Sequence, residues 1–504
     1  MDPYLNQWLK TLSFAQIIHA EGKEADTGIK AVAKIYEAAR NALEYRADHL
    51  VKRAAIERIM KRELTLSRDA EVLADHLDQE LRWVDYTSQR QEDKKVRSQV
   101  ITVIQKYQKY LDDSGIDRDL LMGMMSAEME TVLNPNPDYH KFNQLAFGYF
   151  RKRIQTVHAD HLDLYLLAAV EKVYGQSDDQ RTAYRLFELM ARQAGNDSVE
   201  VLKKTEKLFK QAKESPITNK LSILVRKDMG ALVLIRDMYF AHPKLFVECL
   251  EEEDKFKYFS EKVLDEQLEK LGKRTNTAMF RSLVYVFLTK MVFGFGIEIP
   301  AEKWFSGSVQ PMALVINLLF PVFLMWLLAA NVRLPNEEDR KRLIEKAWET
   351  ISRYSLPAPE EEVVKSLEKR TSAVKRNIFY LFYGLLFGLS FSLVIWSLWK
   401  IGFNAISMVI FMFFLCVVSF FAFRVKQMAM QYQVRKSYHD KSSLLETLLL
   451  PMVAVGGWLS KEVSRLNFLV FIFDFILEAP LKTILRFLES WLDFLSAKKE
   501  EITI

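Results

Sequence analysis

The sequence predicts an all-α fold with a membrane-embedded part, and three observations support this prediction. Glycine (17) and proline (13) are scarce for 504 residues, which leaves few turn residues to join strands. Strict alternation of apolar and polar residues, which marks a half-buried strand, is almost absent. Four long apolar runs follow a charged stretch of about 275 residues. Each run is long enough to cross a bilayer, for which a helix needs roughly 20 residues.

Residues 1–275 are expected to form a cytoplasmic domain of several amphipathic helices. Apolar positions recur three and four residues apart, with Lys and Glu between them, as a helix with one buried face requires. The clearest stripe contains Ile29, Val32, Ile35, Tyr36, Ala39 and Leu43. No motif repeats at a fixed spacing, so a solenoid and a compact bundle are both compatible with this part of the chain.

Residues 276–424 are expected to form a transmembrane bundle. Its four spans are predicted at about 277–299, 312–332, 377–399 and 403–423, and a cytoplasmic loop is predicted at 333–376. That loop contains eleven Lys or Arg residues, whereas the two connections on the other side contain only Lys303 and Lys400. Short loops rich in Lys and Arg stay in the cytoplasm. The pattern therefore predicts an integral membrane protein with its N- and C-termini cytoplasmic.

Residues 425–504 are expected to form a C-terminal amphipathic, membrane-apposed region. Its last part carries a wide apolar face, with charged residues on the opposite side, as in helices that lie in a membrane interface. The apolar face is Leu481, Ile484, Leu485, Leu488, Trp491, Leu492 and Leu495, and Lys482, Arg486, Glu489 and Asp493 lie opposite. The alternative is that the apolar face packs on the protein's own helices. Whether 444–479 enters the bilayer stays open.

Two features of the spans are candidates for function. Lys290 lies near the middle of the first span, where a charge costs at least about 2.5 kcal/mol unless it is paired or hydrated. The alternative without a functional role is that the side chain reaches back to the membrane interface, or that the span is short and tilted. Gly384, Gly388 and Ser392 are spaced four apart and form a small-residue ridge of the kind that lets membrane helices pack closely, within the chain or between copies.

The densest set of metal-ligating side chains is His158-Ala-Asp-His161-Leu-Asp163. We expect residues 139–175 to be one helix, which would put His158 and His161 on one face. A zinc site needs further ligands, and the His-Glu-x-x-His motif of metalloproteases is absent. Surface histidines are therefore the preferred interpretation. The sequence also lacks a phosphate-binding loop, a nucleophile elbow and a Cys-x-x-Cys pair, so no cofactor is implied.

These observations favour a non-enzymatic scaffold or adaptor that anchors a helical interaction domain at the bilayer, although they do not exclude an enzyme. Its expected partners are the lipid bilayer and a cytoplasmic protein, and homo-oligomers are compatible with the ridge. A nucleic acid is not expected, because the net charge of +5 is not gathered into a dense basic patch. The alternative function is a component of a membrane transporter or channel, with Lys290 in the conduction path.

Overall fold

The computed structural model contains eighteen α-helices and no strand among the residues it describes. This confirms the predicted all-α class. The described residues are 3–12, 33–34, 37, 50–86, 94–113, 115–133, 137–154, 161–294, 296, 299–306, 311–330, 335–354, 373–429, 432, 444–465, 482–484, 487–488, 491 and 494–495.

The chain divides into two compact units. The N-terminal unit contains Asp2–Arg226, Tyr354–Val364 and Phe468–Ile504, and the bundle unit contains Lys227–Arg353 and Lys365–Asn467. The division falls inside helix α11 (Pro216–Ala241). The helices of the N-terminal unit are α1 (Pro3–Leu9), α3 (Val51–Leu66), α4 (Ala70–Trp83), α5 (Lys94–Asp113), α6 (Arg118–Leu133), α7 (Pro137–Arg153), α8 (Leu162–Val173), α9 (Asp179–Ala194) and α10 (Val199–Glu214).

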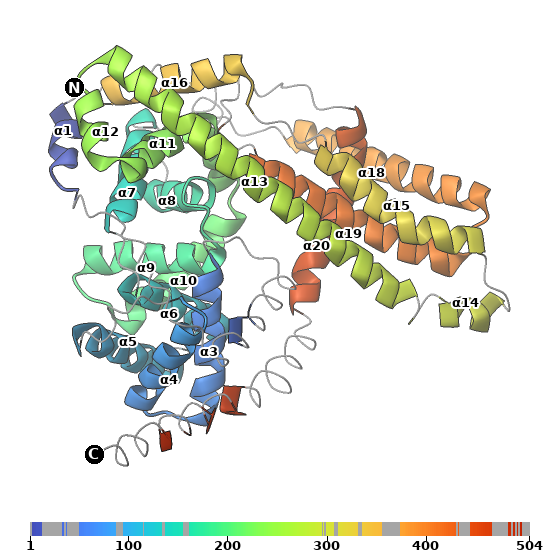
Figure 1. Ribbon diagram of the computed structural model, residues 1–504, viewed down its shortest axis with the longest axis horizontal. Helices are drawn as coiled ribbons and strands as arrows, with labels where there is room; N and C mark the ends of the chain where they lie inside the picture. The colour runs from blue at the N-terminus through green and yellow to red at the C-terminus, as the bar shows by residue number, and fades with distance from the viewer. Residues whose placement is uncertain are drawn as a thin grey trace. The chain divides into compact units, whose positions relative to one another are not determined.

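Helices α3 to α6 close into a bundle rather than an open array. Helix α3 contacts both α4 and α6, and α5 contacts both α4 and α6. Helices α9 and α10 join the same apolar core, in which Met60, Ile104, Met125 and Leu202 are buried. Figure 1 shows these short helices packed against one another. Side chains cap several helix starts, and Asp69, Asp178 and Ser198 each accept a hydrogen bond from a backbone N–H in the first turn.

The bundle unit contains longer helices. After α11 come α12 (Pro243–Cys249), α13 (Glu253–Phe293), α14 (Ile299–Ser306), α15 (Pro311–Ala330), α16 (Glu337–Ser352), α18 (Ala373–Ile401), α19 (Ala405–Ala429) and α20 (Leu444–Arg465). Helix α19 packs against α13, α15 and α20, and α18 packs against α20 (Figure 1). Their shared core buries Met325, Phe411, Leu415 and Met452.

All four apolar runs contain helix, but only two helices of the described residues are long and apolar enough to cross a membrane. These are Asn377–Ile401 in α18 and Ala405–Lys426 in α19. The apolar part of α15, Val315–Leu327, is shorter. The first predicted span is not a separate helix, because it forms the second half of the 41-residue helix α13. Only 6% of the most apolar segment of α18 is buried, so the described part of the protein leaves most of its apolar surface uncovered.

Candidate functional site

Helix α13 carries charged side chains along its first half and apolar ones along its second. Its first half forms intrahelical ion pairs such as Lys257–Glu253 and Lys273–Glu269. Its second half exposes Phe280, Val284 and Phe287, which are spaced four and three residues apart. One continuous helix therefore passes from a polar environment into one suited to apolar surface.

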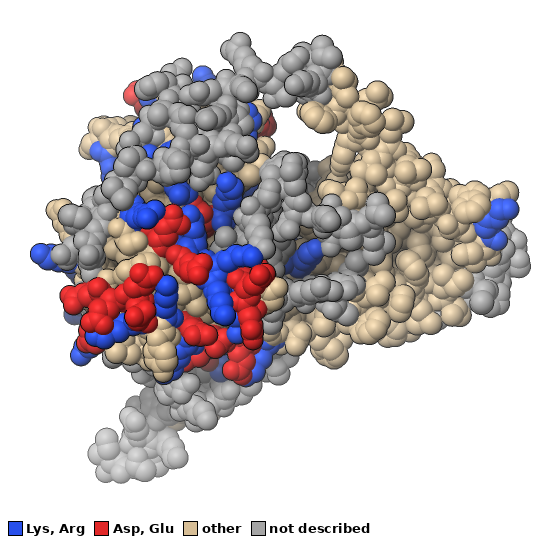
Figure 2. Space-filling model, turned by 90° about the horizontal axis from the view of Figure 1, so that it is seen from above, with Lys and Arg blue, Asp and Glu red and all other residues tan. Residues whose placement is uncertain are grey.

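Helix α16 lies within the predicted cytoplasmic loop, and it packs on the charged half of α13. Arg340 Nη1 lies 2.6 Å from Asp265 Oδ1, and the rings of Phe256 and Trp348 lie 5.3 Å apart. The inward face of α16 buries Leu343, Ile344, Ala347 and Ile351. In Figure 2, acidic and basic side chains gather on one part of the visible surface, while another part is almost uncharged.

Lys290 lies inside the bundle rather than at its surface. Lys290 is only 1% exposed, and its Nζ lies 4.4 Å from the centre of the Phe414 ring on α19. This distance permits a cation–π contact. The Lys290 side chain thus lies among the helices of the bundle. Leu283, two helical turns earlier on α13, packs on the same core.

A second buried polar residue of the bundle escaped the sequence analysis. Asn317 on α15 is fully buried, in a helix that packs against both α13 and α19. The sequence did contain a signal for this residue, because Asn317 is a lone amide in the apolar run Met312–Leu328. Polar side chains at such positions are candidates for function or for bonding between helices.

The predicted small-residue ridge does not pack against the described part of the chain. A Cβ added at Gly384 or Gly388 would meet no atom within 4 Å, and Ser392 is exposed. The buried face of α18 instead includes Ser390 and Leu398. Packing of the ridge within this chain is therefore not observed, and packing between copies stays a prediction.

The close helix approach occurs at a glycine that was not predicted. A Cβ on Gly456 of α20 would lie 2.1 Å from the backbone oxygen of Cys416 on α19. That is far inside ordinary van der Waals contact, so only glycine fits this crossing. Helix α20 carries Gly456-Gly457 in an apolar stretch, and this pair was the available signal.

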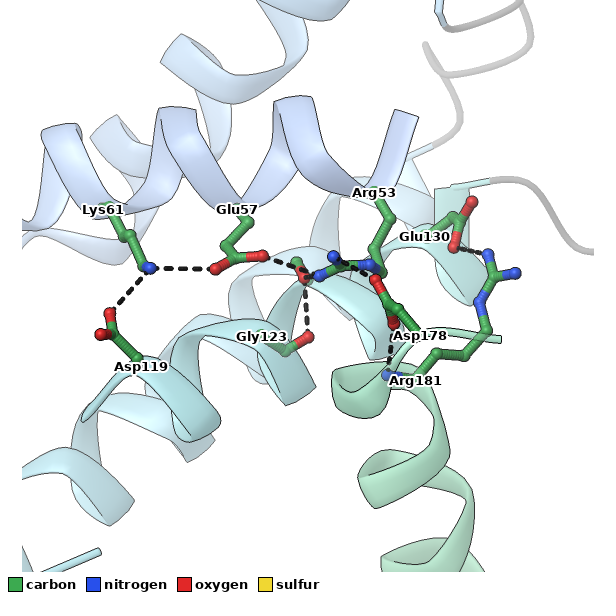
Figure 3. Close-up of polar contacts among 9 residues, drawn as sticks. Arg53, Glu57, Lys61, Asp119, Gly123, Glu130, Asp178 and Arg181 are labelled. Atoms are coloured by element: carbon green, nitrogen blue, oxygen red, sulfur yellow. Dashed lines mark hydrogen bonds and ion pairs between the residues drawn. The ribbon is translucent and has the colours of Figure 1, made fainter. Parts of the chain in front are cut away.

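A network of buried charges joins three helices of the N-terminal unit (Figure 3). Arg53 on α3 has a side chain only 1% exposed, and its Nη2 lies 2.5 Å from Asp178 Oδ2. Its Nη1 donates hydrogen bonds of 2.8 Å to Glu57 Oε2 and to Ser126 Oγ on α6. Ser126 in turn donates to the Gly123 carbonyl. Arg53 therefore ties α3 to α6 and to the start of α9.

The network continues on both sides. Lys61 lies 2.9 Å from Glu57 and 2.8 Å from Asp119, and Asp178 also accepts from the backbone N–H of Arg181 at 2.9 Å. Burial raises the pKa of the Glu57 carboxyl, but the charges of Arg53 and Lys61 outweigh burial and lower the pKa overall. These contacts have the arrangement of a structural ion-pair network, because each charge faces an opposite one.

The histidine pair is not placed on one helix. The helix expected over 139–175 is interrupted, because α7 ends at Arg153 and α8 begins at Leu162. His161 is exposed and has φ of +60° just before α8, whereas His158 lies outside the described residues. Asp163 forms an ion pair of 2.5 Å with Arg151. In the residues that the structure describes, no three His, Cys, Asp or Glu side chains gather as metal ligands do.

No known family model matches this sequence, and neither a curated protein nor a solved structure resembles it.

Proposed function

We propose that the protein is an integral membrane scaffold with four spans, whose N-terminal unit presents a helical interaction surface on the cytoplasmic side. The single observation that carries the membrane topology is the contact between α16 and the charged half of α13.

The contact of α16 with α13 restricts the number of crossings between them. Asp265 and Arg340 form an ion pair, so residues 265 and 340 lie on the same side of any bilayer. An even number of spans must therefore separate them. Both predicted spans between these residues cross, or neither does.

A second contact also requires an even number of crossings, over a longer stretch of the chain. Tyr432, which follows α19, donates a hydrogen bond from its hydroxyl to Asp237 Oδ2 on α11. Burial raises the pKa of the Tyr432 hydroxyl, and the neighbouring Asp237 charge raises it further, so the phenol stays protonated and keeps donating. The end of α19 thus lies on the side of α11, as four crossings require.

Packing favours four crossings over two. Helices α13 and α15 both lie against α19, which is of membrane length. Because packed helices share the same depth, the apolar halves of α13 and α15 belong at the level of α19 in the bilayer. The eleven Lys and Arg of 333–376 then set the orientation, with α16 in the cytoplasm.

Two features of the N-terminal unit support the scaffold role. The N-terminal unit has its own apolar core and is therefore a folded module rather than a linker. A hollow beside it, lined by Ala74, Asp75, Val100 and Leu133, holds about 40 Å³, which is far below the roughly 300 Å³ of small ligand pockets. The large helical surface suits a protein partner better than this hollow suits a substrate.

Cysteine labelling tests the topology. In a chain with Cys249 and Cys416 replaced by alanine, Trp304→Cys on α14 reacts with an impermeant maleimide on intact cells. Lys341→Cys on α16 reacts only after permeabilisation. Trp304 is 87% exposed and Lys341 is exposed, so both thiols are accessible to the reagent. Labelling of Lys341→Cys from outside intact cells contradicts the four-span model.

Photocrosslinking tests the scaffold role. A photoreactive residue at Lys204, which is exposed on α10, yields a discrete protein adduct in cells. The same residue at Leu389, which is 61% exposed on α18, yields lipid adducts. If a series of exposed sites on α5, α9 and α10 gives no protein adduct, the scaffold proposal fails.

A transporter or channel component is the second candidate, and buried Lys290 is the observation that favours it. A cation and the Asn317 amide inside one helix bundle resemble the polar groups that line solute pathways. Lys290→Leu separates the two functions in reconstituted vesicles. Loss of ion or solute flux with unchanged assembly supports transport, while unchanged behaviour favours the scaffold.

A further inference from the structure

The described part of the C-terminal stretch has an unusual orientation. Its described positions are helical, and six large apolar side chains are 40–68% exposed: Ile484, Phe487, Leu488, Trp491, Phe494 and Leu495. Lys482, at the start of the same stretch, is only 3% exposed. Trp491 lies nine positions beyond Lys482, about 180° around a helix. Lys482 therefore faces the protein, and the described apolar side chains face outward.

Lys482 enters a site on α4 that suits a lysine. Its Nζ lies 3.7 Å from Glu80 Oε2, and the Glu80 side chain is fully buried. The same Nζ lies 5.4 Å from the centre of the Trp83 ring, within the range of a cation–π contact. A carboxylate and an aromatic face together are a common way to hold a cation. We call Glu80 and Trp83 the lysine socket.

Several buried charged side chains surround the socket. Glu80 Oε1 accepts a hydrogen bond from Arg62, and Arg62 also lies 3.1 Å from Glu63. All three side chains are at most 5% exposed. His76 Nδ1 also lies 2.6 Å from Glu63 Oε2, so Glu63 has a partner besides Arg62, and Lys482 adds a positive charge beside Glu80. Removing a partner from a buried ion pair leaves an uncompensated charge, which is strongly destabilising.

We propose that Glu80 and Trp83 form a binding site for a lysine side chain, filled in cis by Lys482. This clasp fastens the C-terminal stretch to the N-terminal unit with its apolar face outward, and that face lies in the bilayer interface. The N-terminal unit thereby gains an attachment to the membrane in addition to the spans. The clasp itself is independent of the proposed function, whereas the bilayer contact rests on it.

The bilayer is the occupant that the chain makes available to this face. Residues 466–481 connect it to the end of α20 and reach at most about 55 Å when fully extended. Helix α20 packs on α19, which is of membrane length. A face of Trp, Phe, Leu and Ile held within that reach suits the boundary between headgroups and acyl chains.

Hydrogen exchange tests the clasp in the full chain in nanodiscs. Lys482→Gln speeds amide exchange in peptides covering 479–496 by about tenfold or more, and Glu80→Gln does the same. Lys482→Arg keeps the charge and stays near wild type. Lys204→Gln removes an exposed charge from the same unit and leaves exchange unchanged. Unchanged exchange in α9 and α10 shows that each variant is folded. If Lys482→Gln behaves like Lys204→Gln, there is no clasp.

Lipid quenching tests the bilayer contact. A fluorophore on Phe487→Cys, in the chain without native cysteines, is quenched by doxyl-labelled lipids in nanodiscs. The same label on Leu389→Cys of α18 is quenched, and the label on Lys204→Cys is not. Quenching at 389 but not at 487 overturns the bilayer contact alone. Absence of quenching at 389 overturns the proposed membrane location as well.

Discussion

The clearest test of the N-terminal unit is Arg53→Met, which removes the central charge of the network and keeps much of the side-chain volume. Arg53 faces two carboxylates, Asp178 at 2.5 Å and Glu57 at 2.8 Å. Their side chains are 20% and 12% exposed. Without Arg53, Asp178 loses its nearest cation and Glu57 keeps only Lys61. Breaking a buried pair in this way costs about 3–5 kcal/mol.

That cost is large against the stability of the unit. Domains unfold with free energies of about 5–15 kcal/mol. For a domain of 150–250 residues, each kcal/mol lowers the unfolding temperature by about 2–4 °C. We therefore expect Arg53→Met to lower the temperature of the N-terminal unit's transition by about 6–20 °C. Thermal unfolding of the full chain in detergent measures this shift, with hydrogen exchange in α3, α6 and α9 as the readout.

A matched control is available in the same unit. Arg68 pairs with Asp112, but these side chains are 76% and 51% exposed, and such surface pairs contribute about 0–1 kcal/mol. Arg68→Met should therefore lower the transition by no more than about 4 °C. Adding Asp178→Asn to Arg53→Met should restore part of the loss, because asparagine still caps α9 but carries no charge. An Arg53→Met shift no larger than that of Arg68→Met would falsify the reasoning.

Three further predictions follow from contacts in both units. Gly456→Ala should lower the bundle's free energy of unfolding by about 1–3 kcal/mol, since it overpacks α20 on α19. Gly384→Ala should not lower it, and equal losses for the two variants contradict this. Burial raises the pKa of Glu188, but His140 and Arg185 lower it to about 2 from its usual 4.5. The resulting stabilisation is present above about pH 4.5 and is lost as pH falls towards 2. Glu188→Gln should flatten that part of the stability profile, and an unchanged slope counts against it. Cysteines at Asp265 and Arg340 should join through a short thiol crosslinker within one chain, and failure with both thiols reactive argues against α16 docking.

The sequence alone was sufficient for the helical class and for the approximate positions of the long apolar helices. Both depend on local patterns: scarce turn residues, helical periodicity and uninterrupted apolar runs. Lys290 was also visible as a charge inside an apolar run. Its contact with Phe414 was not, because that contact joins residues far apart in the chain. The sequence likewise could not show that the first span continues a charged helix, since the change in composition near residue 277 looked like a boundary.

Only the tertiary structure decided which side chains face one another. Glycines in two apolar helices looked alike in the sequence. Yet a Cβ added at Gly456 would strike a backbone oxygen, whereas one added at Gly384 would meet no atom of the described residues within 4 Å. The amphipathic pattern put Lys482 on the charged side of its helix, whereas in the structure it is buried beside Glu80. Periodicity assigns a residue to a face of its own helix, because that depends only on the helical repeat. The partner of that face depends on contacts between distant segments, which no local pattern encodes.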